Sequence, residues 1–514
     1  MKFFGAKELE SMSHEKLLDT ILYIVPGTKT VITWADAVEG TLITGSTGSG
    51  KSSGAGRYIA HAMLKSGYGM CILCAKKDER NRWLRYIEET APERKKDLVL
   101  FSKESGHQFN FLQYEMERIG EGAGDVLNAV EALMSLNEQN RVYLSGGGGG
   151  KDERFWDLSL RRLISRCIST LRLADEAVNV PNMRRLVTDC FKDNEPAEYE
   201  KLEHQANNQG GDPQKRKQAV ERLDSWLESS YFLQVLLKIS NKDFSEADSE
   251  DVELAINYWL KEFPKIGEKA TSIVVESFMG IVEPFLNKGI LKDQFAKGLS
   301  PELLPEKIYK EGKIVIVDFP IKEFGIAGIY AATIFKTTFQ AAMERRDIEI
   351  EHDPKPVGLW IDEYQQFCTH KTDSQFQATA RSSWVATVYI TQNINNIFYV
   401  MGNDQPESKT KSLLGNLNLK YFASNDNYDT NLWASNMIGE HLVDFQSIGF
   451  SKDMEISKTR NQQMQFRVTP DHFTVLKTGR KANNYIVETV VFKSGKNWGK
   501  NKQNFALVGF DQRK

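Results

Sequence analysis

The chain has 514 residues, of which 41% are hydrophobic, so it is long enough for a large buried core and about two to four domains. Its 66 basic and 69 acidic residues give a formal charge of −3, which excludes a global attraction to nucleic acid or to an anionic membrane. The five cysteines are too few and too scattered for a disulfide framework, which predicts a reducing, cytoplasmic environment.

The first 39 residues form an N-terminal segment of mixed polarity. They lack the apolar core and the cleavage site of a secretory signal. No stretch of the sequence reaches the roughly 18 uncharged apolar residues that a membrane-spanning helix requires. We therefore expect a cytoplasmic protein with no direct membrane span, associated with a membrane only where a partner supplies the anchor.

A glycine-rich motif follows the first predicted strand, Gly40 to Thr44, and precedes a predicted helix, Ser52 to Leu64. The glycines let backbone N–H groups turn inward around phosphates, and the helix directs its positive dipole end at them. The order of strand, loop and helix is typical of a Walker A phosphate loop, which predicts ATP and magnesium as cofactors. Lys51 is expected to reach the β and γ phosphates, and Ser52 to ligate magnesium. The predicted nucleotide-binding residues are Gly45, Ser46, Thr47, Gly48, Ser49, Gly50, Lys51, Ser52 and Ser53.

Short apolar or β-branched runs predict further buried strands, and helical patterns lie between them. Such alternation is typical of an α/β fold with a mostly parallel sheet and helices on both faces. Cys71 and Cys74 lie in one of these runs, and we interpret them as core residues rather than half of a zinc site. The further strands are predicted at 69–75, 98–102, 313–319, 357–362, 384–391 and 419–424.

Helical patterns dominate between about Tyr114 and Pro301, which predicts a largely α-helical inserted domain. Its clearest helices are expected at 125–136, 155–173, 214–227 and 251–262. The glycine run 146–150 inside it lacks the Gly-Lys-Ser/Thr ending and the preceding strand of a phosphate loop, so it predicts a flexible linker.

An acidic pair, Asp362 and Glu363, ends the apolar strand that begins at Val357. Open α/β sheets bind ligands at the carboxyl ends of their strands, so the pair is expected beside the phosphate loop. Asp362 is predicted to hold the magnesium shell, and Glu363 to orient or deprotonate an attacking water, which indicates hydrolysis. Gln392 ends a later strand and Arg381 precedes it, so they are candidates for a γ-phosphate sensor and an arginine finger that reaches a neighbouring subunit.

These motifs, in this order, resemble the FtsK/HerA superfamily of DNA-pumping ATPases, and most closely the conjugative coupling ATPases of type IV secretion, the TraG/TraD kind. The segment 74–79 resembles the family's "DPKGE"-like segment, 107–112 its "xxNPL" segment, and 312–320 its re-entry strand. The segment 362–367 resembles its "DEFxxL" Walker B motif. Arg381 and Gln392 follow Asp362 at the spacing at which this family carries its arginine finger and its glutamine.

The resemblance implies a RecA-like P-loop NTPase domain and a ring, expected to be a hexamer, in which ATP hydrolysis at subunit boundaries moves DNA. Single- or double-stranded DNA and a relaxase, secretion-channel or other protein are the partners that it implies. The family's transmembrane helices are not carried over, because only about 40 residues of mixed polarity precede the P-loop. The predicted organisation is an N-terminal segment (1–39), a first ATPase part (40–117), an all-α insertion (118–302), a second ATPase part (303–492) and a basic, solvated tail (493–514).

Three functions stay open at this point: a DNA translocase, a nucleotide-dependent remodeller or loader of proteins, and a scaffold that uses ATP only to assemble. The sequence-derived site supports the ATPase directly, whereas the DNA and the ring rest on the resemblance. The near-neutral charge is compatible with a channel lined by a few basic residues per subunit and also with no DNA binding.

Overall fold

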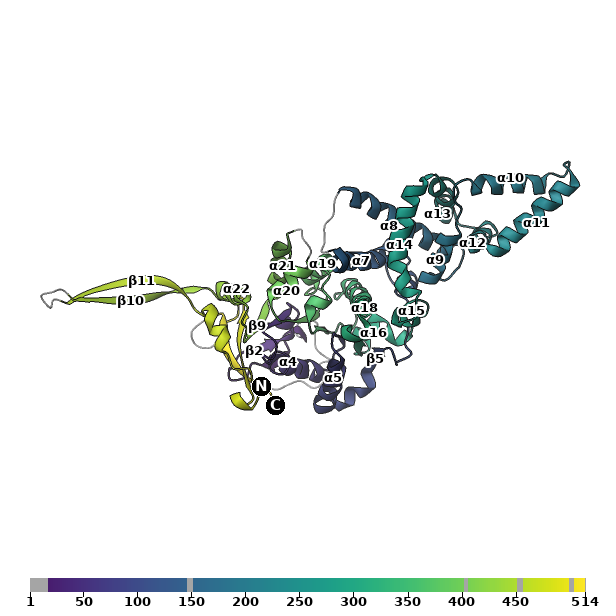
Figure 1. Cartoon of the computed structure of the whole chain (residues 1–514). Helices are drawn as coiled ribbons and strands as arrows, with labels where there is room; N and C mark the ends of the chain where they lie inside the picture. Colours follow the sequence, from purple (N-terminus) through teal and green to yellow (C-terminus); the bar gives the residue numbers. More distant parts are fainter. Residues whose placement is uncertain (1–16, 146–150, 402–404, 451–455, 499–502, 514) are drawn as a thin grey trace. The chain divides into compact units, whose positions relative to one another are not determined.

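The computed structural model describes residues 17–145, 151–401, 405–450, 456–498 and 503–513 (Figure 1). The chain divides into two compact units. The first comprises Met1–Ser102, Pro305–Gly325 and Lys336–Lys514, and the second comprises Lys103–Leu304 and Ile326–Phe335. The second unit begins earlier than the insertion expected at 118–302, and the predicted glycine linker at 146–150 lies outside the described residues.

The first unit is built on a nine-stranded sheet. The strands from β9 to β5 are parallel, and β12 pairs antiparallel with β9 and with β13 at one edge. Every strand predicted from the sequence is present, and the predicted α/β class is confirmed. In spatial order the strands are β13 (Phe505–Asp511), β12 (Ile486–Lys493), β9 (Leu419–Ala423), β3 (Thr41–Thr44), β8 (Val385–Thr391), β7 (Val357–Ile361), β4 (Met70–Cys74), β6 (Ile314–Asp318) and β5 (Leu98–Ser102).

Helices cover both faces of this sheet, as the continuous apolar character of its strands requires. On one face, Val388 and Ile390 of β8 share a core with apolar residues of α4 (Ala55–Lys65) and α5 (Lys77–Thr90). On the other face, the Thr387 hydroxyl donates to the Gln377 amide oxygen of α19 (His370–Thr379) at 2.8 Å. Successive residues of a strand point to opposite faces, so β8 alone demonstrates both layers.

Cys71 and Cys74 are fully buried free thiols in β4, so their interpretation as core residues is confirmed.

The remaining helices of the first unit connect the strands. They are α16 (Pro305–Lys310), α17 (Ile321–Phe324), the second half of α18 (Ile326–Glu344), α20 (Ile394–Val400), α21 (Pro406–Gly415) and α22 (Tyr428–Ile438).

The spatial order of the strands positions the predicted motifs. β8 lies between β3 and β7 and pairs in parallel with both. The phosphate loop leaves the carboxyl end of β3, the Asp362–Glu363 pair leaves that of β7, and Gln392 follows β8 between them. Parallel pairing therefore gathers all three at one edge of the sheet.

The prediction of a solvated basic tail over 493–514 is wrong for its described residues. Lys493 is buried at the end of β12 and forms ion pairs with Glu39 and, at 3.5 Å, with Asp36. Lys496 also pairs with Asp36. Residues Phe505–Asp511 then return as β13. Strand pairing and ion pairs between residues far apart in sequence outweigh the local charge pattern that suggested a tail.

A long antiparallel ribbon was not predicted from the sequence. It consists of β10 (Glu440–Phe450) and β11 (Ile456–Phe466), which pair over their whole length. A smaller pair in the N-terminal segment, β1 (Ile21–Ile24) and β2 (Val31–Thr33), leads into the short helix α3 (Trp34–Ala37). The buried Trp34 joins this segment to the core of the first unit.

The second unit is helical, with an aromatic cluster in its core. Trp259 is fully buried, packs edge-on against Phe232, and donates from its indole nitrogen to the Thr170 hydroxyl at 2.8 Å. The helices are α6 (Phe111–Glu117), α7 (Val126–Ser145), α8 (Lys151–Leu173), α9 (Val180–Asp189), α10 (Glu195–Asn207), α11 (Pro213–Ser229), α12 (Tyr231–Ser240), α13 (Glu246–Asn257), α14 (Glu268–Val282) and α15 (Ile290–Phe295), with the first half of α18.

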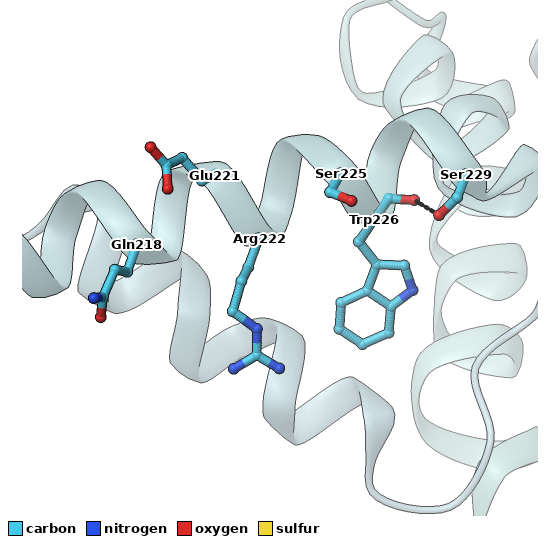
Figure 2. Close-up of a pocket in the computed structure, with 6 residues that line it drawn as sticks. All are labelled: Gln218, Glu221, Arg222, Ser225, Trp226 and Ser229. Atoms are coloured by element: carbon cyan, nitrogen blue, oxygen red, sulfur yellow. Dashed lines mark hydrogen bonds between the residues drawn. The ribbon is translucent and has the colours of Figure 1, made fainter.

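One face of α11 borders a shallow surface hollow (Figure 2). Trp226, which lines it, packs edge-on against Phe191, while Arg222 pairs with Glu198 of α10 at 2.7 Å. The residues that line the hollow thus all belong to α11, which the ion pair connects to α10. Among the residues that the structure describes, no helix is long and apolar enough to cross a membrane.

Candidate functional site

The glycine-rich loop after β3 is anchored to both neighbouring strands. The Gly45 N–H donates to the Gln392 carbonyl after β8 at 3.2 Å, and the Ser46 N–H donates to the Ser424 carbonyl after β9 at 2.9 Å. The Asn425 side chain donates to the Gln392 carbonyl at 3.0 Å and ties the two strand ends together. The loop is therefore fixed by backbone hydrogen bonds before any ligand binds.

The loop presents unpaired backbone donors. Gly48 and Gly50 have φ angles of 80° and 86°, which L side chains rarely adopt, and a Cβ on Gly50 would lie 2.5 Å from a Val487 methyl group. Within the described parts of the chain, the N–H groups of Gly48, Gly50, Lys51 and Ser52 donate to no acceptor. Successive free N–H groups at the start of a helix form a cradle for an anion.

The helix after the loop starts later than the sequence predicted. It was expected from Ser52, but α4 begins at Ala55, and residues 51–54 form turns. The Gly56 N–H donates to the Lys51 carbonyl at 2.9 Å, one residue out of the α-helical pattern. The cause is the backbone of the glycine-rich loop, which enters the helix through a wider turn.

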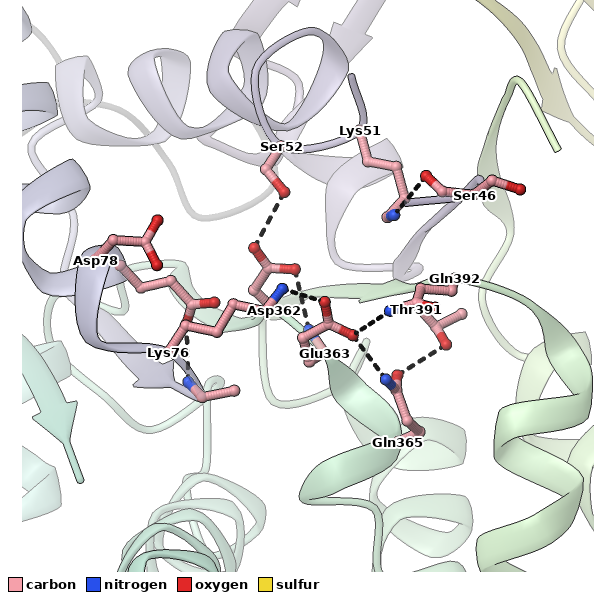
Figure 3. Close-up of polar contacts among 12 residues, drawn as sticks. Ser46, Lys51, Ser52, Lys76, Asp78, Asp362, Glu363, Gln365, Thr391 and Gln392 are labelled. Atoms are coloured by element: carbon pink, nitrogen blue, oxygen red, sulfur yellow. Dashed lines mark hydrogen bonds and ion pairs between the residues drawn. The ribbon is translucent and has the colours of Figure 1, made fainter. Parts of the chain in front are cut away.

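Lys51 and Ser52 converge on Asp362 and Glu363 (Figure 3). The Ser52 hydroxyl donates to Asp362 Oδ2 at 3.0 Å, and Lys51 Nζ donates to the Ser46 carbonyl at 3.1 Å. Burial lowers the pKa of Lys51, although Asp362 and Glu363 oppose that shift. The structure thus places a hydroxyl, an ammonium and two carboxylates in one cluster, as the two motifs predict.

Glu363 is held in a strained backbone conformation. Its φ and ψ angles of 52° and 50° lie in the left-handed region, which costs roughly 1 kcal/mol or more for a residue other than glycine. Its carboxylate accepts hydrogen bonds from the Gln365 amide at 2.7 Å and the Gln392 amide at 3.3 Å, and it pairs with Lys76 (Figure 3). Burial raises the pKa of Glu363, but Lys76 outweighs burial and leaves that pKa below its ordinary value.

Two basic residues of the cluster were not predicted from the sequence. Lys76 contacts Glu363, and Arg82 of α5 contacts Asp362 Oδ2 at 3.3 Å and Asp78 at 2.8 Å. Lys76 lies in the segment 74–79 that carried part of the resemblance, but its sequence gave no sign of a role. Arg82 lies four residues after Asp78, a spacing that predicts an ion pair along one helix. Together they neutralise the two acidic residues.

Glu79 stabilises the connection that carries Lys76. It is buried, and its carboxylate accepts the Ala75 N–H at 2.8 Å. Burial raises the pKa of Glu79, and the charge of Asp362 adds to that rise. Glu79 therefore fixes the turn between β4 and α5 from inside the protein.

A buried ion pair supports the segment that follows Glu363. Lys336 Nζ contacts Asp373 at 2.7 Å and donates to the Phe367 carbonyl at 2.6 Å, and neither charged side chain is exposed. Asp373 also accepts the Tyr364 hydroxyl at 2.8 Å, and the Tyr364 ring stacks on Tyr389 of β8 at 4.1 Å. Each charge is compensated by several hydrogen bonds, which a buried ion pair requires.

Arg381 does not join this cluster. It precedes β8 and therefore lies at the amino edge of the parallel strands, opposite the edge that Gln392 occupies. Its side chain is 75% exposed and lies 3.9 Å from Glu39. Within one subunit, the two residues predicted from family spacing are thus at opposite ends of the same strand.

These features define a class of protein. A mostly parallel sheet, an anion cradle after β3 and an acidic pair after β7, with β8 between them, form a RecA-like P-loop NTPase fold. The donors suit a phosphate chain and a hard cation, because free N–H groups and Lys51 bind phosphate oxygens, while Ser52 and Asp362 offer oxygen ligands of the kind magnesium prefers.

Comparison with known proteins agrees with this class. A family model described as the TraM recognition site of TraD and TraG matches residues 356–477. The bacterial conjugative coupling protein TrwBdeltaN70, in its unbound monoclinic form, has a TM-score of 0.53 at 12% identity and covers 99% of this chain and 92% of that chain.

Two further TrwB structures are similar in fold. The complex with the non-hydrolysable ATP analogue ADPNP has a TM-score of 0.54 at 13% identity, and the complex with ADP and Mg2+ has 0.54 at 12%; each covers 99% of this chain and 93% of that chain. The fold is therefore that of a conjugative coupling protein, and the resemblance predicted from the sequence is confirmed. A search of curated proteins found no match.

Proposed function

We propose that this chain is an ATP-driven motor that couples hydrolysis of magnesium-bound ATP to DNA movement, as part of conjugative transfer or a related DNA-pumping process. The observation that carries the proposal is the convergence of Ser52, Asp362, Glu363 and Gln392 at the carboxyl edge of the sheet. Three different strand ends supply these groups. Parallel pairing brings the strand ends together, and a role at one common ligand accounts for the polar groups that they carry.

Each residue has a chemical role in the proposed reaction. The free N–H groups of Gly48, Gly50, Lys51 and Ser52 bind phosphate oxygens, and the Lys51 side chain turns from the Ser46 carbonyl toward the β and γ phosphates. Glu363, which Lys76 keeps ionised, accepts a proton from the attacking water. Gln392 hydrogen-bonds to the Glu363 carboxylate and holds the same water in line.

Ser52 and Asp362 would hold the magnesium ion, because the hydroxyl oxygen of one lies 3.0 Å from the carboxylate oxygen of the other. When bound, magnesium neutralises the phosphate oxygens and so lowers the barrier to attack on the γ phosphate. The TrwB structures with ADPNP and with ADP and Mg2+ support this assignment, because the chain shares their fold. Ser46, Thr47, Ser49 and Ser53 complete the proposed loop.

The ring is the second part of the proposal. Arg381 is exposed and lies at the edge of the sheet away from its own P-loop, so it can act only on the nucleotide of a neighbouring subunit. A hexameric ring would place one such arginine at each interface. The resemblance to the coupling proteins supports both the ring and DNA as the substrate, with a relaxase or a secretion-channel component as partners.

The proposal is tested by ATP hydrolysis with no DNA, with single-stranded DNA and with double-stranded DNA, each at low and at physiological salt. We expect turnover that DNA stimulates, and stimulation that falls as salt rises. The Lys51→Ala variant, which should not turn over ATP under any condition, is the control for contaminating ATPases. Turnover that ignores both forms of DNA contradicts the DNA motor.

A second function, remodelling or loading of a protein, is favoured by one observation. The family model that matches residues 356–477 is described by its recognition of a protein, TraM. This function predicts turnover that responds to a protein partner and not to DNA. A scaffold that only assembles on ATP predicts instead that Glu363→Gln leaves function intact.

A further inference from the structure

A strained loop lies against the phosphate cradle. Arg480 has φ and ψ angles of 60° and 177°, a region that is essentially restricted to glycine. Asn484 and Tyr485, four and five residues later, also have positive φ angles of 51° and 61°. Such strain persists only where the surrounding structure imposes it, and it concentrates at functional sites.

Gln512, which follows β13, holds this loop in place. Its amide oxygen accepts the Arg480 N–H at 2.7 Å, and its amide nitrogen donates to the hydroxyl of Ser53, the last residue of the phosphate loop, at 2.6 Å. Its backbone N–H donates to the Tyr485 carbonyl at 2.9 Å, and its carbonyl accepts from Arg57 of α4 at 2.6 Å. Gln512 therefore fixes the position of Arg480 relative to the phosphate loop.

The backbones of the two loops also approach each other closely. A Cβ on Gly50 would lie 3.3 Å from the Thr478 carbonyl, and a Cβ on Gly48 would lie 3.6 Å from Nη2 of Arg480. The guanidinium thus borders the space that a side chain on Gly48 would occupy. Among the residues that the structure describes, the Arg480 guanidinium has no hydrogen-bonding or ion-pair partner, whereas Arg82 pairs with Asp78 and Asp362.

A guanidinium held this way is suited to a phosphate. It carries a permanent positive charge and several N–H donors, and it binds phosphate oxygens in a bidentate manner. The adjacent cradle has free N–H groups on Gly48, Gly50 and Lys51, which require an anionic ligand. Arg480 lies beside these N–H groups with an unpaired guanidinium and a strained backbone. The phosphate that the N–H groups bind is therefore also a suitable ligand for Arg480.

We propose that Arg480 is a nucleotide-binding residue, which contacts the phosphate chain of the nucleotide held by the phosphate loop of its own subunit. The strained loop 478–485 serves to deliver this contact. The inference rests on the proposed nucleotide site. It adds a cationic residue from the C-terminal part of the chain, acting within one subunit, whereas Arg381 acts between subunits.

The test compares Arg480→Gly, Arg480→Lys and the control Lys481→Ala, which removes an exposed charge from the same loop. Two quantities are measured: the melting temperature without nucleotide, and the Kd for ADP and for a non-hydrolysable ATP analogue at fixed salt. Arg480→Gly should raise the melting temperature, because glycine relieves the strain. The same variant should weaken nucleotide binding by about tenfold, because a charged hydrogen-bonding group is lost.

Arg480→Lys should keep the strain and lose the bidentate contact, so it should weaken binding by about threefold with no gain in melting temperature. Lys481→Ala should change neither quantity. Equal losses for ADP and the ATP analogue place the contact on the α or β phosphate, and a loss for the ATP analogue alone places it on the γ phosphate. A purely structural role moves the melting temperature without moving Kd.

Nucleotide binding by Arg480→Gly that equals wild type overturns the inference. The proposed function fails in a different way: wild type itself would not bind nucleotide, or Lys51→Ala would bind as wild type does. The two failures are thus distinguishable in one set of titrations.

Discussion

The two edges of the parallel sheet are built in opposite ways. At the carboxyl edge, Glu363 has a left-handed backbone, the phosphate loop keeps unpaired N–H groups, and Ser52 bonds a carboxylate that is suited to a metal. At the amino edge, Asp36 and Glu39 are paired with lysines from the end of β12 and the turn after it. The carboxyl edge thus has a strained backbone and unpaired N–H donors, whereas the amino edge has carboxylates that are paired with lysines.

The difference indicates where ligand binding and where stability are located. At the carboxyl edge, unpaired N–H donors and the strained backbone of Glu363 cost stability, and binding of a ligand accounts for their presence. At the amino edge, ion pairs between distant segments join β12 to the start of β3. Arg381 is the exception at the amino edge, because it is 75% exposed and is 3.9 Å from Glu39. The exposure of Arg381 therefore agrees with the proposal that it acts on a neighbouring subunit and contributes little to the stability of its own.

The largest expected effect is that of removing the Arg381 side chain, the exception at the amino edge. Arg381→Ala should lower kcat by about a thousandfold or more, because arginine fingers contribute on that scale. It should leave the melting temperature unchanged, since a single exposed ion pair contributes little. Steady-state ATP hydrolysis and thermal unfolding measure the two quantities, with Arg184→Ala on α9 as the matched exposed arginine.

Mixing subunits then locates the site at which Arg381 acts. Arg381→Ala and Lys51→Ala subunits, each inactive alone, should recover activity when mixed, because an interface can then combine an intact P-loop with an intact arginine. If the mixture stays inactive although mixed rings form, Arg381 does not act across the interface, and it belongs with the structural charges of the amino edge.

A smaller effect is expected from Gln392 at the other end of β8. Its amide lies 3.3 Å from the Glu363 carboxylate, so Gln392→Ala should lower kcat by about ten- to a hundredfold. The Kd for ATP should change little, because the phosphate cradle is unaltered. The control is Gln375→Ala on α19, and an equal loss of kcat in both variants would refute a specific role for Gln392.

The smallest expected effect concerns the stability of the sheet itself. Lys420 of β9 is buried, and burial, with the charge of Lys493, lowers its pKa to about 8. The folded state thus disfavours the protonated lysine. This penalty is fully present below about pH 8 and is relieved as the pH rises toward the unfolded value of about 10.4.

Lys420→Met should therefore raise the free energy of unfolding at pH 7 by about 2 kcal/mol, since it removes the penalty but leaves the Leu417 carbonyl without this donor. The gain should shrink as the pH rises from 8 to 10. Denaturant unfolding at several pH values measures it, and a gain independent of pH would show that the charge is not the cause.

Much of the parallel sheet was predictable because its strands are local signals. Each is a short apolar run, and motifs such as Gly45 to Ser52 carry their own chemistry. Once β8 was taken as a neighbour of β3 and β7, the position of Gln392 beside Glu363 followed. That Lys51, Ser52, Asp362 and Glu363 form one cluster follows from the same reasoning.

The features that sequence did not reveal depend on distant contacts. β12 and β13 pair across the edge of the sheet, and Lys493 is buried by ion pairs with residues more than 400 positions earlier, so its local charge pattern was misleading. Lys76 and Arg82 gain their roles only by proximity to the acidic pair. The strain at Glu363 and Arg480 leaves no mark in composition, because neither is a glycine.

We propose that the carboxyl edge hydrolyses ATP and that Glu363 is the residue that activates water. The most direct measurement is ATP binding and ATP turnover in one preparation of Glu363→Gln, beside wild type and the Lys51→Ala control. For Glu363→Gln we expect a Kd for ATP within about twofold of wild type and turnover lowered by at least about a hundredfold. Turnover close to wild type, with binding intact, would contradict it.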